Sequence, residues 1–299
     1  MEEPRREHCI STYEIHSQCA FSAVGKTLVA PMDRVKYLLQ SQGEMLRVGR
    51  LQVPFDGAWD CFRRIVAVEG FGGLFRGNII QIVGLLPTAL ATSLVAIPAQ
   101  SVAFEILTER TPLSEFLVNV ASGVIGASAA AIISYPLDFA RFRLAMDFKP
   151  HMCCRYEFRH TVDILAHPVI SECPHLIYRG FSIYILGSFL YRAVFYTTFL
   201  CVAPFLPHEG SSSSVMLKQA LAGYAMVSLS TVALYPLDTV RRRMMYAVTE
   251  DVFSYRSFVE ACRSIAQREG PRGFYRGAAF TVARGSVTSV LALLVGVHA

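Results

Sequence analysis

The chain has 299 residues, of which 53% are hydrophobic and only 17% are charged. A soluble protein of this length needs more charge to cover its surface, so the composition favours a membrane protein. The eight cysteines are too sparse for a disulfide framework and show no CxxC spacing, so we interpret them as free thiols and expect no metal site. Residues 1–7 carry three acids, and no apolar run follows them. That pattern fits neither a secretory signal nor an Arg-rich transit peptide.

Six segments of the chain are apolar enough to cross a membrane, which takes about 20 residues per helix. Three of them contain no Asp, Glu, Lys or Arg, namely 77–104, 116–137 and 219–237. The other three are interrupted by one base each: 15–32 by Lys26, 180–208 by Arg192 and 277–299 by Arg284. The sequence therefore predicts an all-α membrane protein with six transmembrane helices.

The formal net charge of +5 is unevenly distributed along the chain. The long segments 33–77, 138–180 and 238–277 hold seven, six and eight Lys and Arg residues, which is 21 of the 28. Consecutive spans place all three segments on one side of the membrane. By the positive-inside tendency this is the inner side, with both termini on the outer side.

Two short motifs recur three times in the same order. The first, Pro-x-Asp-x-x-base, begins at Pro31, Pro136 and Pro236, at intervals of 105 and 100 residues. The second joins an acid to a later aromatic-base-Gly triplet, whose last two residues are Arg76 and Gly77, Arg179 and Gly180, and Arg276 and Gly277. This periodicity predicts three tandem repeats, which we assign to 1–107, 108–210 and 211–299.

The first motif has a physical interpretation at the inner ends of the odd-numbered spans. Proline inside a helix removes a backbone hydrogen bond and kinks the helix, and an acid and a base three residues apart lie on one helical face. Three such helices can form a ring in which each acid pairs with a neighbour's base and closes a central cavity. A local pair within each helix would explain one motif but not its threefold repetition. The ring residues are Asp33, Lys36, Asp138, Arg141, Asp238 and Arg241.

The second motif lies where each even-numbered span begins. Its glycine permits a tight turn, and its arginine beside unpaired helical N–H groups forms an anion site. A lipid phosphate is one candidate ligand for these three Arg-Gly pairs. Simple anchoring at the membrane surface is an equal alternative.

Together these residues resemble the mitochondrial carrier family, and the resemblance covers nearly the whole chain. The segment Arg241-Arg242-Arg243-Met244-Met245 looks like the RRRMMM signature of the ADP/ATP carriers, ending here in Tyr246. The resemblance implies a monomeric, pseudo-threefold six-helix bundle with short matrix helices in the mitochondrial inner membrane, both termini facing the intermembrane space. It implies alternating access without enzyme activity, with no cofactor apart from bound cardiolipin and no nucleic acid partner. Gln40 matches the glutamine that braces one ion pair of the inner, matrix-side gate.

The bases inside the spans, Lys26, Arg192 and Arg284, form a basic cavity with no acid at comparable depth in the sequence. Buried arginine binds phosphate or carboxylate in a bidentate manner, so the substrate is expected to be an anion. The resemblance implies ADP and ATP, with two sets of contacts. Lys26, Arg242 and Arg284 would hold phosphates, and Gly187 and Tyr191 would line the adenine pocket, where Ser188 replaces an isoleucine. Core packing is an equal alternative for Tyr191.

Several positions depart from the ADP/ATP carriers. Gly84 replaces a substrate-binding arginine, and Leu234 replaces a serine beside the adenine. The outer ends of the even-numbered spans lack the acid–base pairs of a second gate, so we expect the matrix-closed, outward-open state to be favoured. Outer closure would rest on apolar residues such as Ile97, Leu200 and Val295. Another phosphorylated or carboxylate anion, or a degenerate bundle that no longer transports, therefore stays an open alternative.

Overall fold

The computed structural model describes residues 12–91, 93–94, 98, 101–102, 105, 112–149, 156–158, 160–167, 170, 172–205, 213–248, 255 and 257–296. Within these ranges every regular element is a helix, in agreement with the predicted all-α class. The longer helices are α1 (Thr12–Val48), α2 (Ala58–Glu69), α3 (Asn78–Val83), α4 (Leu85–Ala91), α6 (Pro112–Met146), α9 (Phe181–Val202), α10 (Ser213–Ala233), α11 (Tyr235–Tyr246), α12 (Phe258–Glu269) and α13 (Ala278–Gly296). The shorter ones are η1 (Phe71–Phe75), α7 (Thr161–Leu165), η3 (Pro174–Tyr178), η4 (Ala203–Phe205) and η5 (Pro271–Tyr275).

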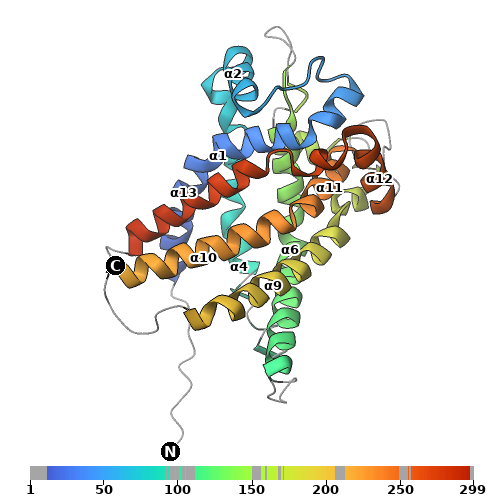
Figure 1. Cartoon of the computed structure of the whole chain (residues 1–299). Coiled ribbons are helices and arrows are strands. Elements are labelled where there is room, and N and C mark those ends of the chain that lie inside the picture. The colour runs from blue at the N-terminus through green and yellow to red at the C-terminus, as the bar shows by residue number, and fades with distance from the viewer. Residues whose placement is uncertain are drawn as a thin grey trace, which may run out of the picture.

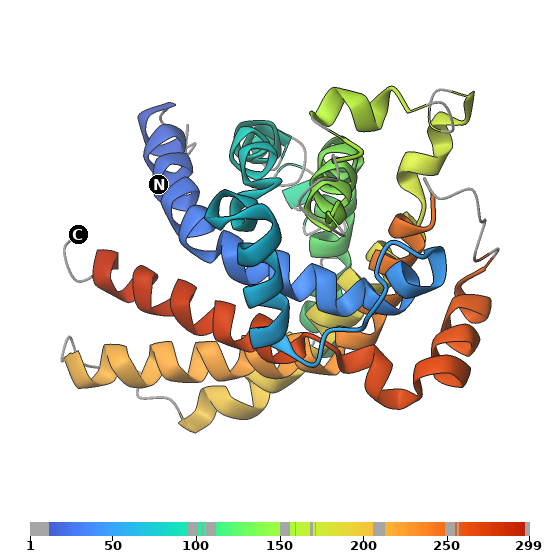
Figure 2. The ribbon, with the colours of Figure 1, turned by 90° about the horizontal axis from the view of Figure 1, so that it is seen from above.

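The long helices pack side by side around the molecule and bring the first helix, α1, against the last, α13. α6 lies against α4 and α9, α9 and α13 lie against α10, and α13 also packs against α1. The first and third repeats are therefore in direct contact. In Figure 1, α6, α9, α10 and α13 fan out from the region of α11 and α12, and Figure 2 shows the same bundle from above.

The three motif prolines have two different effects on their helices. α1 continues through Pro31 and α6 continues through Pro136. In the third repeat the helix is broken between α10 and α11, which are bent by 55°. Pro236 lies in the first turn of α11, where its missing N–H is not needed for the helix. The predicted kink is thus a complete break in this repeat.

Three helical segments among the described residues are long and apolar enough to cross a membrane: Phe71–Ala91, Val120–Met146 and Pro174–Phe205. The bent pair Leu217–Ala233 and Tyr235–Tyr246 would make a fourth. α1 and α13, which contain the first and sixth predicted spans, do not meet this criterion over their described residues. The count of six transmembrane helices and the pseudo-threefold symmetry remain predictions.

The second predicted span differs from an uninterrupted helix. It begins as α3 and is interrupted at Gly84, after which α4 continues to Ala91. Apart from a few described positions, the part beyond 91 lies outside the described residues. That part includes Ile97 of the expected outer closure.

The buried core lies around the segments that follow the prolines. Leu38, Phe139 and Phe142 are fully buried there, together with Ile65 of α2. In contrast, the apolar window of Pro174–Phe205 has no buried share at all. An apolar helix that the protein leaves largely unburied is what contact with lipid requires.

Candidate functional site

Three ion pairs join the repeats just after the motif prolines of α1, α6 and α11. Their N–O distances are 2.6 Å for Asp33–Arg141, 3.5 Å for Asp138–Arg241 and 3.3 Å for Asp238–Lys36. Each repeat contributes one acid and one base, and each pair links two repeats. The ring pairing that the motif predicted is therefore present, rather than three pairs within single helices.

Gln40 stands beside one of these pairs, as expected from the resemblance. Its Nε2 donates to Asp238 Oδ2 at 3.4 Å and to Thr239 Oγ1 at 3.0 Å. The corresponding positions in the other repeats hold Ala145 and Met245, which are buried and apolar. Of the three ion pairs, only Lys36–Asp238 therefore accepts a hydrogen bond from a glutamine at this position.

Two of the predicted phosphate ligands already contact the carboxylates of the ring. Arg284 Nη1 lies 3.1 Å from Asp33 Oδ1, and Arg242 Nε lies 3.4 Å from Asp238 Oδ1. The expectation that no acid lies at comparable depth is wrong for Arg284. Because α13 packs against α1, the long side chain of Arg284 reaches Asp33, two residues after Pro31 of α1.

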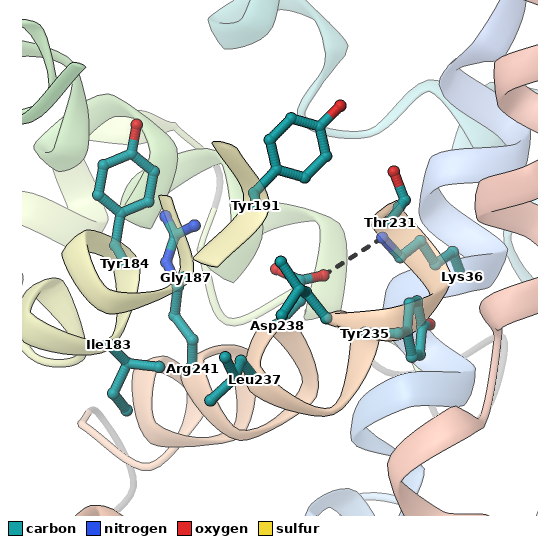
Figure 3. Close-up of a pocket in the computed structure, with 11 residues that line it drawn as sticks. Lys36, Ile183, Tyr184, Gly187, Tyr191, Thr231, Tyr235, Leu237, Asp238 and Arg241 are labelled. Atoms are coloured by element: carbon teal, nitrogen blue, oxygen red, sulfur yellow. Dashed lines mark hydrogen bonds and ion pairs between the residues drawn. The ribbon is translucent and has the colours of Figure 1, made fainter. Parts of the chain in front are cut away.

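A cavity of about 180 Å³ lies directly above the Lys36–Asp238 pair (Figure 3). Gly187 and Tyr191 of α9 line it, together with Thr231 of α10. An added Cβ at Gly187 would meet no atom within 4 Å, so the glycine keeps this wall open. The volume is below the 300–1,000 Å³ of a typical ligand pocket and suits one ring of a ligand.

Leu234 also lines this cavity, where the ADP/ATP carriers are expected to have a serine. Ser188 is half-buried on α9 but is not part of the lining. The structure therefore brings Gly187 and Tyr191 together with the ion-pair ring, and it does not bring Ser188 with them.

Lys26 lines a second, smaller cavity of about 50 Å³. Gly84 lies in the same wall, and Asp138 and Arg141 of the ring form its floor. The missing side chain at Gly84 thus leaves a small polar space next to Lys26 rather than a charge.

Arg192 lies outside both cavities. Its guanidinium lies across Gly123 of α6, at the place that a Cβ of residue 123 would occupy. The glycine is therefore the space that admits this long side chain between α6 and α9. Substrate contact by Arg192 stays a prediction.

The three glycines of the second motif have the backbone conformation that was expected. Gly77, Gly180 and Gly277 have φ values of 83°, 85° and 84°, in the left-handed region. Each lies against the helix that carries the Pro-x-Asp motif of another repeat. A Cβ would come within 3.0 Å of Arg141 O at Gly77 and within 3.2 Å of Lys36 O at Gly277.

The arginines of that motif contact protein groups. Arg76 Nη2 lies 2.6 Å from Asp147 Oδ2, and Arg276 Nη1 lies 2.7 Å from Glu269 Oε2. Arg179 donates to the carbonyl oxygen of Tyr255. Lipid binding by these residues stays a prediction.

A cavity of about 780 Å³ opens beside Arg76 and Gly77, between η1 and α7. An extended lipid head group would fit a cavity of this volume.

Sequence reasoning missed the tyrosines that precede two of the prolines. Tyr135 Oη donates to Arg179 O at 2.9 Å, and Tyr235 Oη donates to Arg276 O at 2.8 Å. Each hydroxyl joins the helix that carries the Pro-x-Asp motif to the Arg-Gly element of the same repeat. The repeated Tyr-Pro-Leu-Asp string was the available signal, and the first repeat has Ala30 in its place.

Comparison with known proteins finds similarity over nearly the whole chain. The family model described as "Mitochondrial carrier protein" matches residues 15–100, 113–209 and 212–296. An ADP,ATP carrier protein of Schizosaccharomyces pombe is 36% identical over 269 residues, covering 88% of this chain and 82% of the relative. An ADP/ATP translocase of Thermothelomyces thermophilus is 33% identical over 266 residues, covering 88% and 84%. For a mitochondrial ADP,ATP carrier protein 1 of Gossypium hirsutum, the identity is 34%, covering 88% and 68%.

Proposed function

The chain belongs to the mitochondrial carrier family, and from this premise we propose that it exchanges ADP and ATP across the mitochondrial inner membrane by alternating access. Membership of the family indicates a membrane transporter and not an enzyme. The relatives at 33–36% identity that are named ADP/ATP carriers support the choice of substrate. A monomer with its basic segments in the matrix, its termini in the intermembrane space and cardiolipin at the Arg-Gly elements completes the proposal.

The observation that carries the proposal is the sharing of carboxylates between the ring and the substrate arginines. Asp33 accepts both Arg141 and Arg284, and Asp238 contacts both Lys36 and Arg242. A phosphate group binds guanidinium groups at least as well as a carboxylate does. An arriving polyphosphate would therefore draw Arg284 and Arg242 away from the ring.

This competition connects substrate binding to opening of the matrix side. Once its second arginine is withdrawn, Asp33 is held by one ion pair and its burial is less well compensated. Only a substrate with several negative charges can replace two carboxylates at once. The ring would thus open in response to the correct class of substrate.

The cavity beside Tyr191 supplies a place for the adenine ring. A tyrosine face and an open glycine wall suit a flat aromatic group, and stacking of this kind is worth about 0.5–1.5 kcal/mol. The phosphates would then extend toward Lys26 and Arg284. Both ends of the nucleotide would lie above the ion-pair ring.

The test is counter-exchange in liposomes that contain the purified protein and internal ADP. We expect uptake of labelled ATP that depends on the internal nucleotide. Arg284→Gln should abolish it, whereas Arg63→Gln, on the exposed surface of α2, should not. Absence of exchange by protein shown to be folded would contradict the proposal.

A second candidate is a carrier of another phosphorylated or carboxylate anion. Gly84 and Leu234 favour it, because they remove a base and a hydroxyl from the two cavities. A thermal-shift panel of nucleotides and small organic anions separates the two candidates by the ligand that stabilises most. Saturable uptake of any of these ligands would also argue against a non-transporting bundle.

A further inference from the structure

Tyr37 lies beside two guanidinium groups near the ion-pair ring. It follows Lys36 on α1, and its side chain is almost completely buried. The Cζ of Arg141 lies 5.6 Å from the centroid of its ring, and the Cζ of Arg242 lies 5.0 Å from it. Both distances are within the range of a cation–π interaction.

Phe142 of α6 completes this aromatic site. Its ring meets that of Tyr37 edge to face, with centroids 5.5 Å apart and an interplanar angle of 83°. The Cζ of Arg242 is 5.3 Å from the Phe142 centroid. Arg242 therefore lies against two aromatic rings contributed by two different repeats.

The charge balance of the ring explains why such a site is needed. The ring itself has three acids and three bases, and Arg242 and Arg284 add two further positive charges to the same carboxylates. Water can solvate Arg284, whose side chain is 43% exposed. The side chain of Arg242 is only 12% exposed, and it shares Asp238 with Lys36.

A buried positive charge that only shares a carboxylate needs another source of stabilisation. The negative faces of aromatic rings provide it without adding a competing acid. An additional carboxylate would bind Arg242 tightly and would repel an anionic substrate. A ring stabilises the charge and leaves the arginine available for an anion.

We propose that Tyr37 is a positioning residue, which with Phe142 holds the charged Arg242 beside Asp238 of the ion-pair ring, ready to bind an anionic substrate. The proposal rests on the proposed function for the identity of that anion. It also accounts for a difference between repeats. Lys36 and Arg241 lie over the pre-proline rings Tyr235 and Tyr135, at 5.2 and 5.0 Å. The first repeat has Ala30 before its proline, and Tyr37 supplies the ring over Arg141 instead.

The experiment compares Tyr37→Leu with Tyr37→Phe in reconstituted exchange. Losing the ring should raise the KM for ADP by about 3- to 30-fold, the range expected for one partly to fully desolvated cation–π contact, with a smaller change in kcat. Tyr37→Phe keeps the ring and should restore the KM to within about twofold of the parent protein. Phe148→Leu is the matched control, because it removes a buried ring of the same core that packs on Phe55. It should lower the thermal midpoint without raising the KM.

A second measurement does not depend on the substrate. In a double-mutant cycle, Tyr37→Leu should lower the thermal midpoint of the purified protein clearly less in an Arg242→Gln background than in the parent. Equal losses in both backgrounds would overturn the proposal, as would a KM for Tyr37→Phe as high as that for Tyr37→Leu. If Tyr37→Leu does not fold, Tyr37→Met replaces it in both assays. Failure of ADP exchange by the parent protein would overturn the proposed function, and the cycle would still decide whether Tyr37 holds Arg242.

Discussion

At the scale of single residues, the three acids of the ring are not equivalent. The side chain of Asp33 is 5% exposed and contacts two arginines, at 2.6 and 3.1 Å. The side chain of Asp138 is 45% exposed, and its ion pair with Arg241 is 3.5 Å long. Burial and partner number both indicate that Asp33 contributes more to the stability of the ion-pair ring than Asp138 does.

We therefore predict that Asp33→Asn is much more damaging than Asp138→Asn. Removing one partner of a buried ion pair costs about 3–5 kcal/mol, because the remaining charges are left uncompensated. An exposed pair contributes about 0–1 kcal/mol. Thermal unfolding of the two variants in the same detergent checks this difference. Equal shifts of the midpoint would show that the burial of Asp33 does not matter.

At the same scale, the pairing of the ring was predictable and the position of Arg284 was not. Charge complementarity and threefold repetition restrict each acid to the bases of neighbouring repeats. The contact between Arg284 and Asp33 depends on how α13 packs against α1, and no sequence period reports that packing. Tyr37 was also not predictable. It follows Lys36 in the first repeat, whereas Tyr135 and Tyr235 precede the prolines of the other two repeats.

At the scale of elements, the glycines of the second motif bring the start of each even-numbered span against the helix that carries the Pro-x-Asp motif of another repeat. Their left-handed backbone was predictable from the Arg-Gly spacing at the start of a span. Their close contact with a backbone carbonyl of another repeat was not, because it depends on tertiary packing. The break at Leu234 in the third repeat was also missed, since Pro31 and Pro136 lie inside continuous helices with the same local motif.

Gly77→Ala tests the role of this turn. The φ of 83° disfavours any side chain, and the new Cβ would lie 3.0 Å from Arg141 O. Backbone strain of this kind costs about 1–3 kcal/mol, so we expect a clearly lower thermal midpoint. Gly72→Ala is the control, because Gly72 lies in η1 without a positive φ and with no atom within 4 Å of the Cβ position. Similar midpoints for the two variants would mean that the turn tolerates a side chain.

At the scale of the whole molecule, the buried residues and the ion-pair ring gather at one end. This end carries α2 and α12, and the ring lies there beside the larger buried cluster. Leu200, an expected member of the outer closure, is 59% exposed near the end of α9. That a carrier without an outer ionic ring favours the matrix-closed state stays a prediction.

The orientation of the molecule can be tested with its own cysteines. Cys173 precedes η3 and Cys201 lies in the last turn of α9, and both are exposed. The 32-residue segment Pro174–Phe205 is about 48 Å long if helical throughout, which exceeds the roughly 30 Å hydrocarbon core. The two thiols should therefore emerge on opposite sides of the membrane.

Single-cysteine variants in mitochondria with a ruptured outer membrane provide the measurement. A membrane-impermeant maleimide should label Cys201 directly, and it should label Cys173 only after the inner membrane is permeabilised. Cys61 is the internal control, because its thiol is fully buried and burial raises its pKa to about 12. At neutral pH it is neither accessible nor ionised, so a variant with Cys61 alone should stay unlabelled under both conditions. Labelling of Cys173 before permeabilisation would reverse the orientation and place the basic segments in the intermembrane space.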